Sequence, residues 1–246
     1  MDNFICGLKR NIITPSTAHN LCLNFEDILN LPESFSLLSE SILNNMMIQK
    51  HRDCASQCTI KHIAHSNNLT NKLSVKFQYY NSRFFNNRNE IRDEGSSLED
   101  NLKALMIYGY ISECLHPYDT DVNKEPSYLA YDIALNNMLR NPTNKGYRYL
   151  EQNLLQFKYI LANEKKTIVF GADVYRNIKN INENNILEYP SDDDLLVGSH
   201  GMLIIGFDNS KGFQIANSWN VGDNGVHFIS YRYIMSHLCY DFMLLS

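Results

Sequence analysis

Basic residues are not in excess, and no stretch of the sequence concentrates them. The 246 residues include 22 Lys and Arg against 27 Asp and Glu, which gives a formal net charge of −5. Proteins that bind nucleic acid through its phosphates carry a basic patch or stripe, so we expect no nucleic-acid partner. The 44% of hydrophobic residues is enough for a substantial core, and it excludes disorder as the main state.

Long apolar runs are missing as well. The first residues, MDNFICGLKRNIITP, lack the apolar core of about 7–15 residues that a signal peptide needs, and no later stretch approaches the ~18 apolar residues of a membrane span. The sequence therefore predicts an intracellular protein with no membrane partner. The cysteines are too few and too scattered for a disulfide scaffold, so we expect free thiols at Cys6, Cys22, Cys54, Cys58, Cys114 and Cys239.

No internal repeat and no Pro-rich or Gly-rich linker divides the chain, which indicates one compact unit. Residues 1–35 contain Pro15 and Pro32, and we expect them to form an extended arm over the surface of a domain at 36–246. Helical patterns then follow from Cys58 to about Leu73, at about 126–139 and at about 147–163. The best-defined helix can be capped by Ser96 or Ser97 and ended by Gly109.

The rest of the chain is rich in β-formers. The segments TIVFGADV, GMLIIGF, GFQIANSW and VHFISYRY are short and separated by turn residues. This order predicts an α+β fold with two lobes, a helical N-terminal lobe at about 48–140 and an antiparallel β C-terminal lobe at about 141–246. Clefts between lobes are where sites usually form, so we expect the active site there.

A β-hairpin is predicted around the turn residues Asp208–Gly212. His200 and Asn217 lie at equal distances from its centre, so hairpin formation brings them close together on adjacent strands. A carboxamide beside an imidazole fixes the tautomer and the ring angle, which is how a general base for a nucleophile is held. The alternative is a satisfied polar pair within a sheet.

Cys58 is the candidate nucleophile because it stands at the predicted start of a helix. Unpaired backbone N–H groups and the helix dipole lower a thiol pKa there. Cys54, four residues earlier, is the rival candidate. A zinc site is not favoured, because ligands spread along a helix from position 54 to 65 span ~16 Å, too far for one tetrahedral ion. The side chains considered for that site were His51, Cys54, Cys58, His62 and His65.

Five segments together resemble the papain family of cysteine peptidases, in the short divergent form found in bacteria and large DNA viruses. They are LPESFSLL, DCASQCT before a helix, EGSSLEDNLKALMIYGY, GSHGMLIIGFD and FQIANSWNVGDNGVHFISY. The separation of 142 positions from Cys58 to His200 also falls within the ~130–150 typical of that family. The resemblance covers about residues 30–245 and implies a papain-like two-lobed fold.

The resemblance implies a Cys-His-Asn triad of Cys58, His200 and Asn217 that hydrolyses peptide bonds through a thioester, without a cofactor or metal. It also implies that Trp219 covers the His–Asn hydrogen bond, and that Gly95 and Ser96 pair with the substrate backbone. The expected partner is a peptide or protein substrate, and the oligomeric state is left open. An arm over the cleft would give a zymogen mechanism.

Departures from the family pattern leave alternatives open. The family places a Gln that donates to the oxyanion six residues before the nucleophile, where this sequence has Arg52, so Gln49 is the candidate donor after a local insertion. Asn220 also replaces the usual Gly after NSW. The runner-up interpretation is therefore a weakened or inactive papain-like protein that binds peptides or proteins. A third keeps the triad but acts as an isopeptidase or acyl transferase.

Overall fold

The structure is a computed structural model that describes residues 4–11, 23, 25–85, 92–140, 146–181 and 183–245. Its elements, in chain order, are α1 (Phe25–Leu29), β1 (Ser34–Ser36), α2 (Glu40–Leu43), α3 (Cys54–Ser66), α4 (Val75–Phe84), α5 (Leu98–Tyr108), the 3-10 helix η1 (Glu113–Leu115), α6 (Tyr128–Arg140), β2 (Tyr147–Tyr149), α7 (Leu154–Ala162), β3 (Ile168–Tyr175), the 3-10 helix η2 (Arg176–Asn180), β4 (Ile186–Leu187), β5 (Leu196–Asp208), β6 (Gly212–Ala216), β7 (Val226–Ile229), α8 (Tyr231–Ile234) and β8 (Cys239–Leu245).

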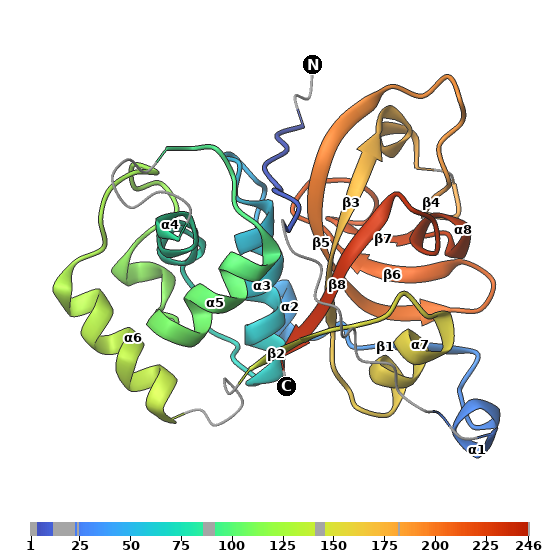
Figure 1. The fold of residues 1–246 in the computed structure, drawn as a ribbon, viewed down its shortest axis with the longest axis horizontal. Coiled ribbons are helices and arrows are strands. Elements are labelled where there is room, and N and C mark those ends of the chain that lie inside the picture. The colour runs from blue at the N-terminus through green and yellow to red at the C-terminus, as the bar shows by residue number, and fades with distance from the viewer. Residues whose placement is uncertain are drawn as a thin grey trace.

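Two lobes lie side by side in Figure 1. Helices α2 to α6 form one lobe, and the sheet with α1, α7 and α8 forms the other. Helix α3 is the helix that faces the sheet, and it packs on β5 and β3. Every residue from Cys54 to Ala64 is buried, because one side of α3 meets the other helices and the opposite side meets the sheet. The predicted two-lobed α+β architecture is thus present.

The sheet has the strand order β2-β8-β3-β5-β6-β7-β4, with β1 added along β5. All its pairs are antiparallel except β4 with β7. The long strand β5 is central: it pairs with β3 over its first part and with β6 over its second. Residues 34–36, at the end of the expected arm, belong to this sheet because Phe35 pairs with Phe207.

Two large apolar clusters stabilise the fold. One lies within the β lobe, where the Phe157, Phe170 and Phe242 rings stack or tilt against each other. The other joins the lobes, since it combines Ala55 of α3 with Leu203 of β5 and other buried side chains. Burial of large apolar side chains contributes about 1.5–3 kcal/mol each, so the second cluster fixes α3 against β5.

The predicted elements are confirmed in part. The helix at α5 begins after Ser97, whose hydroxyl accepts the Asp100 N–H at 3.0 Å, and it ends at Gly109 as predicted. The four β-rich segments contribute β3, β5, β6 and β7. The helix predicted from Cys58 starts instead at Cys54 and ends at Ser66. The helix predicted at 147–163 was wrong in its first part, which forms β2, and α4 was not predicted as a helix.

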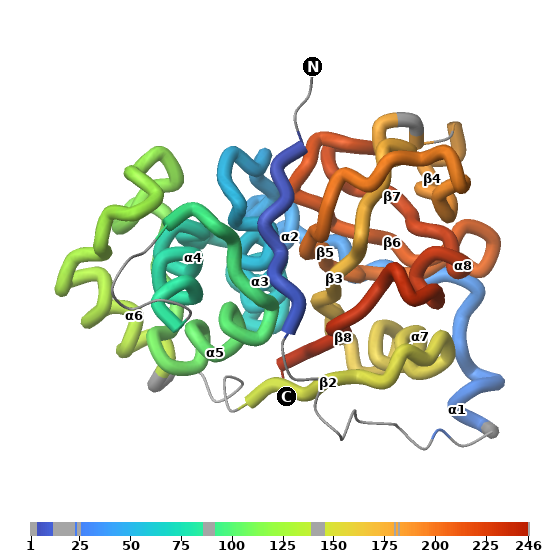
Figure 2. Tube along the Cα trace, turned by 45° about the horizontal axis from the view of Figure 1, so that its top comes forward, coloured from blue at the N-terminus to red at the C-terminus, as the bar shows by residue number. Residues whose placement is uncertain are grey.

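The described part of the N-terminal arm, residues 4–11, runs between the two lobes (Figure 2). Leu8 forms a parallel bridge with Ser96 of the helical lobe and donates its N–H to the Ser199 carbonyl of β5 at 3.3 Å. The arm therefore touches both lobes at once. Pro15, at the middle of the expected arm, lies outside the described residues.

Within the described ranges, no helix combines the length and the apolar character needed to cross a bilayer.

Candidate active site

The hairpin of β5 and β6 brings His200 and Asn217 together. His200 Nε2 and Asn217 Oδ1 are 2.8 Å apart, as the hairpin predicts. Because the amide oxygen accepts, Nε2 carries the proton and Nδ1 is the basic nitrogen of the neutral ring. His200 Nδ1 is buried and has no hydrogen-bond partner among the described residues. The ring is therefore held at one nitrogen and free at the other.

Trp219 covers this pair. Its ring stacks on the His200 ring with the centroids 3.8 Å apart and the planes 17° from parallel. Its backbone N–H also donates to Asn217 Oδ1 at 3.2 Å. His200 is fully buried and Asn217 is nearly so, which excludes water from their hydrogen bond. The indole thus fixes the plane of the imidazole.

Cys54, and not Cys58, is the cysteine at the start of α3 beside this histidine. A Cβ added to Gly201, the residue after His200, would lie 3.2 Å from Ala55 Cα and 3.4 Å from the Cys54 carbonyl carbon. This close approach of the β5 and α3 backbones places Cys54 against Gly201, the residue that follows His200. The backbone N–H groups of Gly201 and Ala55 both act on the Cys54 sulfur.

Cys58 lies one turn further along the helix, so the prediction that it begins the helix was wrong. Its Sγ donates to the Ala55 carbonyl at 3.1 Å within α3. Its side chain packs in the cluster between the lobes. Asp is a preferred N-cap residue, so Asp53 was the available signal that the helix begins at Cys54.

Burial favours the uncharged forms of both Cys54 and His200. Burial raises the pKa of the Cys54 thiol to about 11, although backbone N–H groups of Gly201, Gly7 and Ala55 oppose the shift. Burial also lowers the pKa of His200 to about 3, against the opposing effect of its hydrogen bond to Asn217. The activated thiolate expected at a helix start is therefore absent while the arm covers the site.

The loop before α3 positions Gln49, five residues before Cys54. The Gln49 side chain is anchored by its Oε1, which accepts the Ser218 hydroxyl at 3.1 Å. Its Nε2 donates to two carbonyls, those of His51 at 2.6 Å and Ile5 at 2.9 Å. Ile5 belongs to the arm, so the Gln49 amide binds a carbonyl of a peptide that runs through the cleft.

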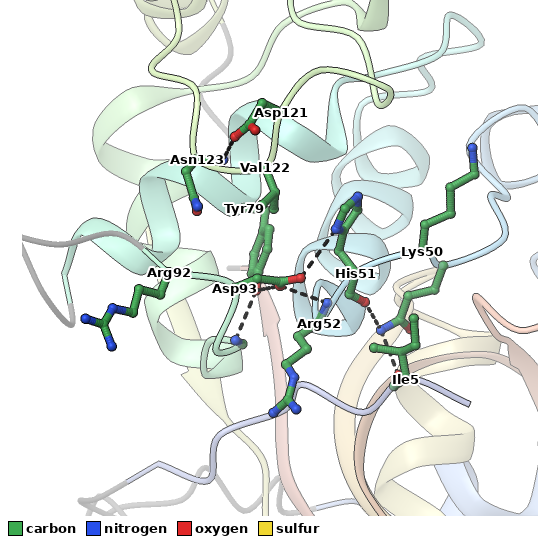
Figure 3. Close-up of polar contacts among 12 residues, drawn as sticks. Ile5, Lys50, His51, Arg52, Tyr79, Arg92, Asp93, Asp121, Val122 and Asn123 are labelled. Carbon is green, nitrogen blue, oxygen red and sulfur yellow. Dashed lines mark hydrogen bonds and ion pairs between the residues drawn. The ribbon is translucent and has the colours of Figure 1, made fainter. Parts of the chain in front are cut away.

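Asp93 makes hydrogen bonds that hold the loop before α3 in place (Figure 3). Its carboxylate accepts the Arg52 N–H at 3.1 Å and the Tyr79 hydroxyl at 2.7 Å, and it lies 3.3 Å from His51 Nδ1. These hydrogen bonds hold the pKa of Asp93 below its ordinary value despite partial burial. The backbone leading into Cys54 is thereby fixed to the helical lobe.

Gly95 and Ser96 pair with the arm in the position that the resemblance implies for a substrate backbone. Ser96 N–H donates to the Gly7 carbonyl at 3.1 Å, and its own carbonyl accepts the Lys9 N–H at 3.2 Å. Gly95 has φ +83°, and a Cβ there would lie 1.7 Å from the Gly7 oxygen. Only glycine allows a chain to lie this close.

A cleft of about 870 Å³ opens beside Gln49 and Trp219 at the start of the described arm. Its lining includes Gln49 and Trp219 from the site and Phe4 and Ile5 from the arm. Phe4 also stacks on Trp219 with the ring centroids 4.4 Å apart. The arm thus covers the indole as well as the thiol. Among the described residues, no three His, Cys, Asp or Glu side chains gather where they could hold a metal ion.

Comparison with solved structures shows what this architecture resembles. Xylellain, a cysteine protease from Xylella fastidiosa, matches with a TM-score of 0.82 and 24% identity, over 98% of this chain and 95% of that one. The fold is papain-like. The procathepsin B of Trypanosoma congolense matches with a TM-score of 0.67 and 16% identity, over 98% and 86% of the two chains. A Carica candamarcensis cysteine protease in complex with E-64 matches with a TM-score of 0.59 and 13% identity, over 87% and 98%.

No protein-family model matches the sequence, and no curated protein sequence matches it.

Proposed function

We propose that this papain-like chain is a cysteine peptidase in which Cys54 is the nucleophile, His200 the base and Asn217 the orienting amide. The observation that carries the proposal is the unpartnered Nδ1 of a His200 ring whose other nitrogen is held by Asn217, beside the first residue of a buried helix. A neutral imidazole with one free nitrogen can accept a thiol proton. Assigning the nucleophile to Cys54 replaces the earlier candidate Cys58.

The reaction follows from these positions. His200 Nδ1 takes the Cys54 proton, and the thiolate attacks the peptide carbonyl carbon. The Cys54 backbone N–H and Gln49 Nε2 stabilise the oxyanion, and the imidazolium then protonates the leaving amine. Water, deprotonated by His200, hydrolyses the thioester and restores the thiol. No cofactor takes part.

The position of Gln49 supports hydrolysis over the binding-only alternative. One oxyanion donor is worth about 10²–10³ in rate, so its loss would favour an inactive protein. Gln49 already donates to the carbonyl of Ile5 in the arm. A side chain that binds one peptide carbonyl in the cleft is suited to bind another. Counted from Cys54, Gln49 lies five residues before the nucleophile, close to the family spacing of six, so the departure at Arg52, which was counted from Cys58, does not remove the donor.

Because the arm occupies the cleft between the lobes, the structure represents a closed form. Gly7 stands against Cys54 and Arg52, since a Cβ at Gly7 would lie 2.1 Å from the Arg52 carbonyl oxygen. A substrate that pairs with Ser96 needs the same backbone groups that Gly7 and Lys9 use. We therefore propose that the peptidase acts after the arm has left the cleft.

The nucleophile is tested with a matched pair of variants, Cys54→Ser and Cys58→Ser, in a full-length chain carrying Leu8→Asp to weaken the arm. Peptide hydrolysis and covalent labelling by E-64, which the Carica enzyme binds, are measured. We expect Cys54→Ser to abolish both and Cys58→Ser to retain both. Loss in Cys58→Ser alone would restore the original assignment. No labelling and no hydrolysis in the Leu8→Asp chain would favour a binding module.

A further inference from the structure

The arm places an arginine against an acidic and aromatic group of side chains near the proposed nucleophile. The Arg10 guanidinium pairs with the Asp173 carboxylate. Its central carbon also lies over the Tyr240 ring, 4.1 Å from the centroid. Arg10 is three residues beyond Gly7, the arm residue that faces Cys54. The occupant of this pocket therefore belongs to the same peptide that fills the cleft.

The groups that meet the Arg10 guanidinium belong to the sheet, Asp173 to β3 and Tyr240 to β8. Asp173 of β3 pairs in register with Ser199 of β5, the residue before His200. Asp173 Oδ1 accepts the Ser199 hydroxyl at 2.8 Å and the Tyr240 hydroxyl at 3.2 Å. These two donors orient the carboxylate, which leaves Oδ2 for the incoming cation. The Asp173 side chain is only 18% exposed, whereas that of Arg10 is 55% exposed.

The chemistry of the pocket suits arginine better than lysine. A guanidinium is planar, so it can donate to a carboxylate and lie on an aromatic face at the same time. Asp241 adds negative charge nearby, because its carboxylate accepts the Asn11 N–H at 3.2 Å and interacts with the charge of Arg10. An ammonium group could approach the carboxylate or the Tyr240 ring as a point charge, but it lacks the planar fork that donates to the one while it lies flat on the other.

We propose that Asp173, Ser199 and Tyr240, here called the Asp173 pocket, select an arginine side chain of the substrate. The inference rests on the proposed peptidase function and names its substrate class: peptides with an arginine two or three residues from the bond that is cleaved. The spacing follows from the extended arm, in which Leu8, Lys9 and Arg10 lead away from the residue at Cys54 along Ser96. Arg10 acts as the internal occupant of the pocket in the closed form.

The test uses paired peptides that differ only in arginine or citrulline, its neutral isostere, at each position near the scissile bond. Hydrolysis is measured with the full-length Leu8→Asp chain. We expect kcat/KM to favour arginine by about tenfold at one position, as a charge-assisted hydrogen bond predicts. Asp173→Asn should remove that preference, so that the arginine and citrulline peptides are hydrolysed at equal rates. The control Glu94→Gln changes the exposed carboxylate that faces Lys9 and should leave the preference intact.

A binding readout separates this inference from the proposed function. The peptide FISGLKRN, which is residues 4–11 with Cys6→Ser, competes with iodoacetamide for Cys54 in the same chain. We expect its arginine form to protect Cys54 at about tenfold lower concentration than its citrulline form, and Asp173→Asn to abolish the difference. Tyr240→Phe, which keeps the ring, provides a second variant if Asp173→Asn fails to fold, and it should reduce the difference.

Protection by arginine without any hydrolysis would keep the Asp173 pocket and refute the peptidase. Hydrolysis with equal rates for arginine and citrulline, or a preference that survives Asp173→Asn, would overturn the pocket alone.

Discussion

Weakening the arm should expose Cys54 to alkylation. Leu8 is 7% exposed and packs between the lobes. Burial of a leucine side chain contributes about 1.5–3 kcal/mol, and each 1.4 kcal/mol is tenfold in an equilibrium. Leu8→Asp loses this contribution and adds the cost of burying a carboxylate. We therefore expect the open fraction of the chain, and with it the alkylation rate of Cys54, to rise at least about tenfold.

The measurement is the rate of iodoacetamide modification at pH 7, with the modified cysteine identified by fragment-ion mass spectrometry. Cys54 and Cys58 lie in one tryptic peptide, DCASQCTIK, so Cys58 serves as an internal reference. Gly7→Ala should act like Leu8→Asp for a different reason, because its Cβ would collide with the Arg52 carbonyl. Thermal unfolding of each variant checks that the domain itself remains folded.

Lys9→Ala is the matched control. Lys9 lies between the other arm contacts, but among the described residues its side chain makes only an exposed pair with Glu94 at 3.8 Å. Such pairs contribute about 0–1 kcal/mol, so the Cys54 rate should rise no more than about fivefold. The reasoning would be refuted by equal Cys54 rates in Leu8→Asp and Lys9→Ala, or by Cys58 reacting before Cys54 in the opened chain.

Three further predictions concern buried groups. Burial raises the pKa of Asp53 to about 7. Ionisation of this carboxyl group therefore lowers the free energy of unfolding as the pH rises from about 4 to 7. Asp53→Asn should raise the melting temperature at pH 8 by more than at pH 4.5. Burial lowers the pKa of His62 to about 3 and of His227 to about 4. At pH values below 6.5 the free energy of unfolding, measured in urea, should therefore decrease, by up to about 1.4 kcal/mol per pH unit for each histidine. In the Leu8→Asp chain, Gln49→Ala should lower kcat about 10²-fold with KM nearly unchanged, and equal kcat would remove Gln49 from the oxyanion site.

The His200–Asn217 pair could be predicted from the sequence because a hairpin is a local structure. Its turn residues and the equal lengths of its two strands fix which positions face each other. The start of α3 could not be fixed in the same way, because the apolar pattern of this segment fits a helix beginning at Cys54 or at Cys58. Asp53, as a possible N-cap, is the one local signal for Cys54, and the approach of Gly201 to Ala55, across more than a hundred residues of chain, is the contact that agrees with it.

Other parts depend on contacts that no local pattern contains. Residues 147–149 carry a helical pattern, yet they form β2 because the last strand, β8, supplies hydrogen-bond partners. The Asp173 pocket joins β3, β5 and β8 with the arm, and Asp173 alone resembles any exposed strand carboxylate in the sequence. The arm's route through the cleft likewise depends on Gly7 and Gly95, whose missing side chains let two backbones meet.

The protonation states of Cys54 and His200 link the position of the arm to the reactivity of the proposed nucleophile. In the closed form burial keeps Cys54 protonated and His200 neutral, so the two groups together hold one proton over a wide pH range. A thiolate–imidazolium pair in the hydrated, open cleft also holds one proton. Opening therefore transfers no net proton to or from this pair at neutral pH, so the pair itself does not make opening depend on pH there. In acid the open pair can bind a second proton, and in alkali it can lose its last one, and each change favours opening through this pair. Near neutral pH, we expect cleavage of the arm, or a competitor for the Asp173 pocket, to open the cleft.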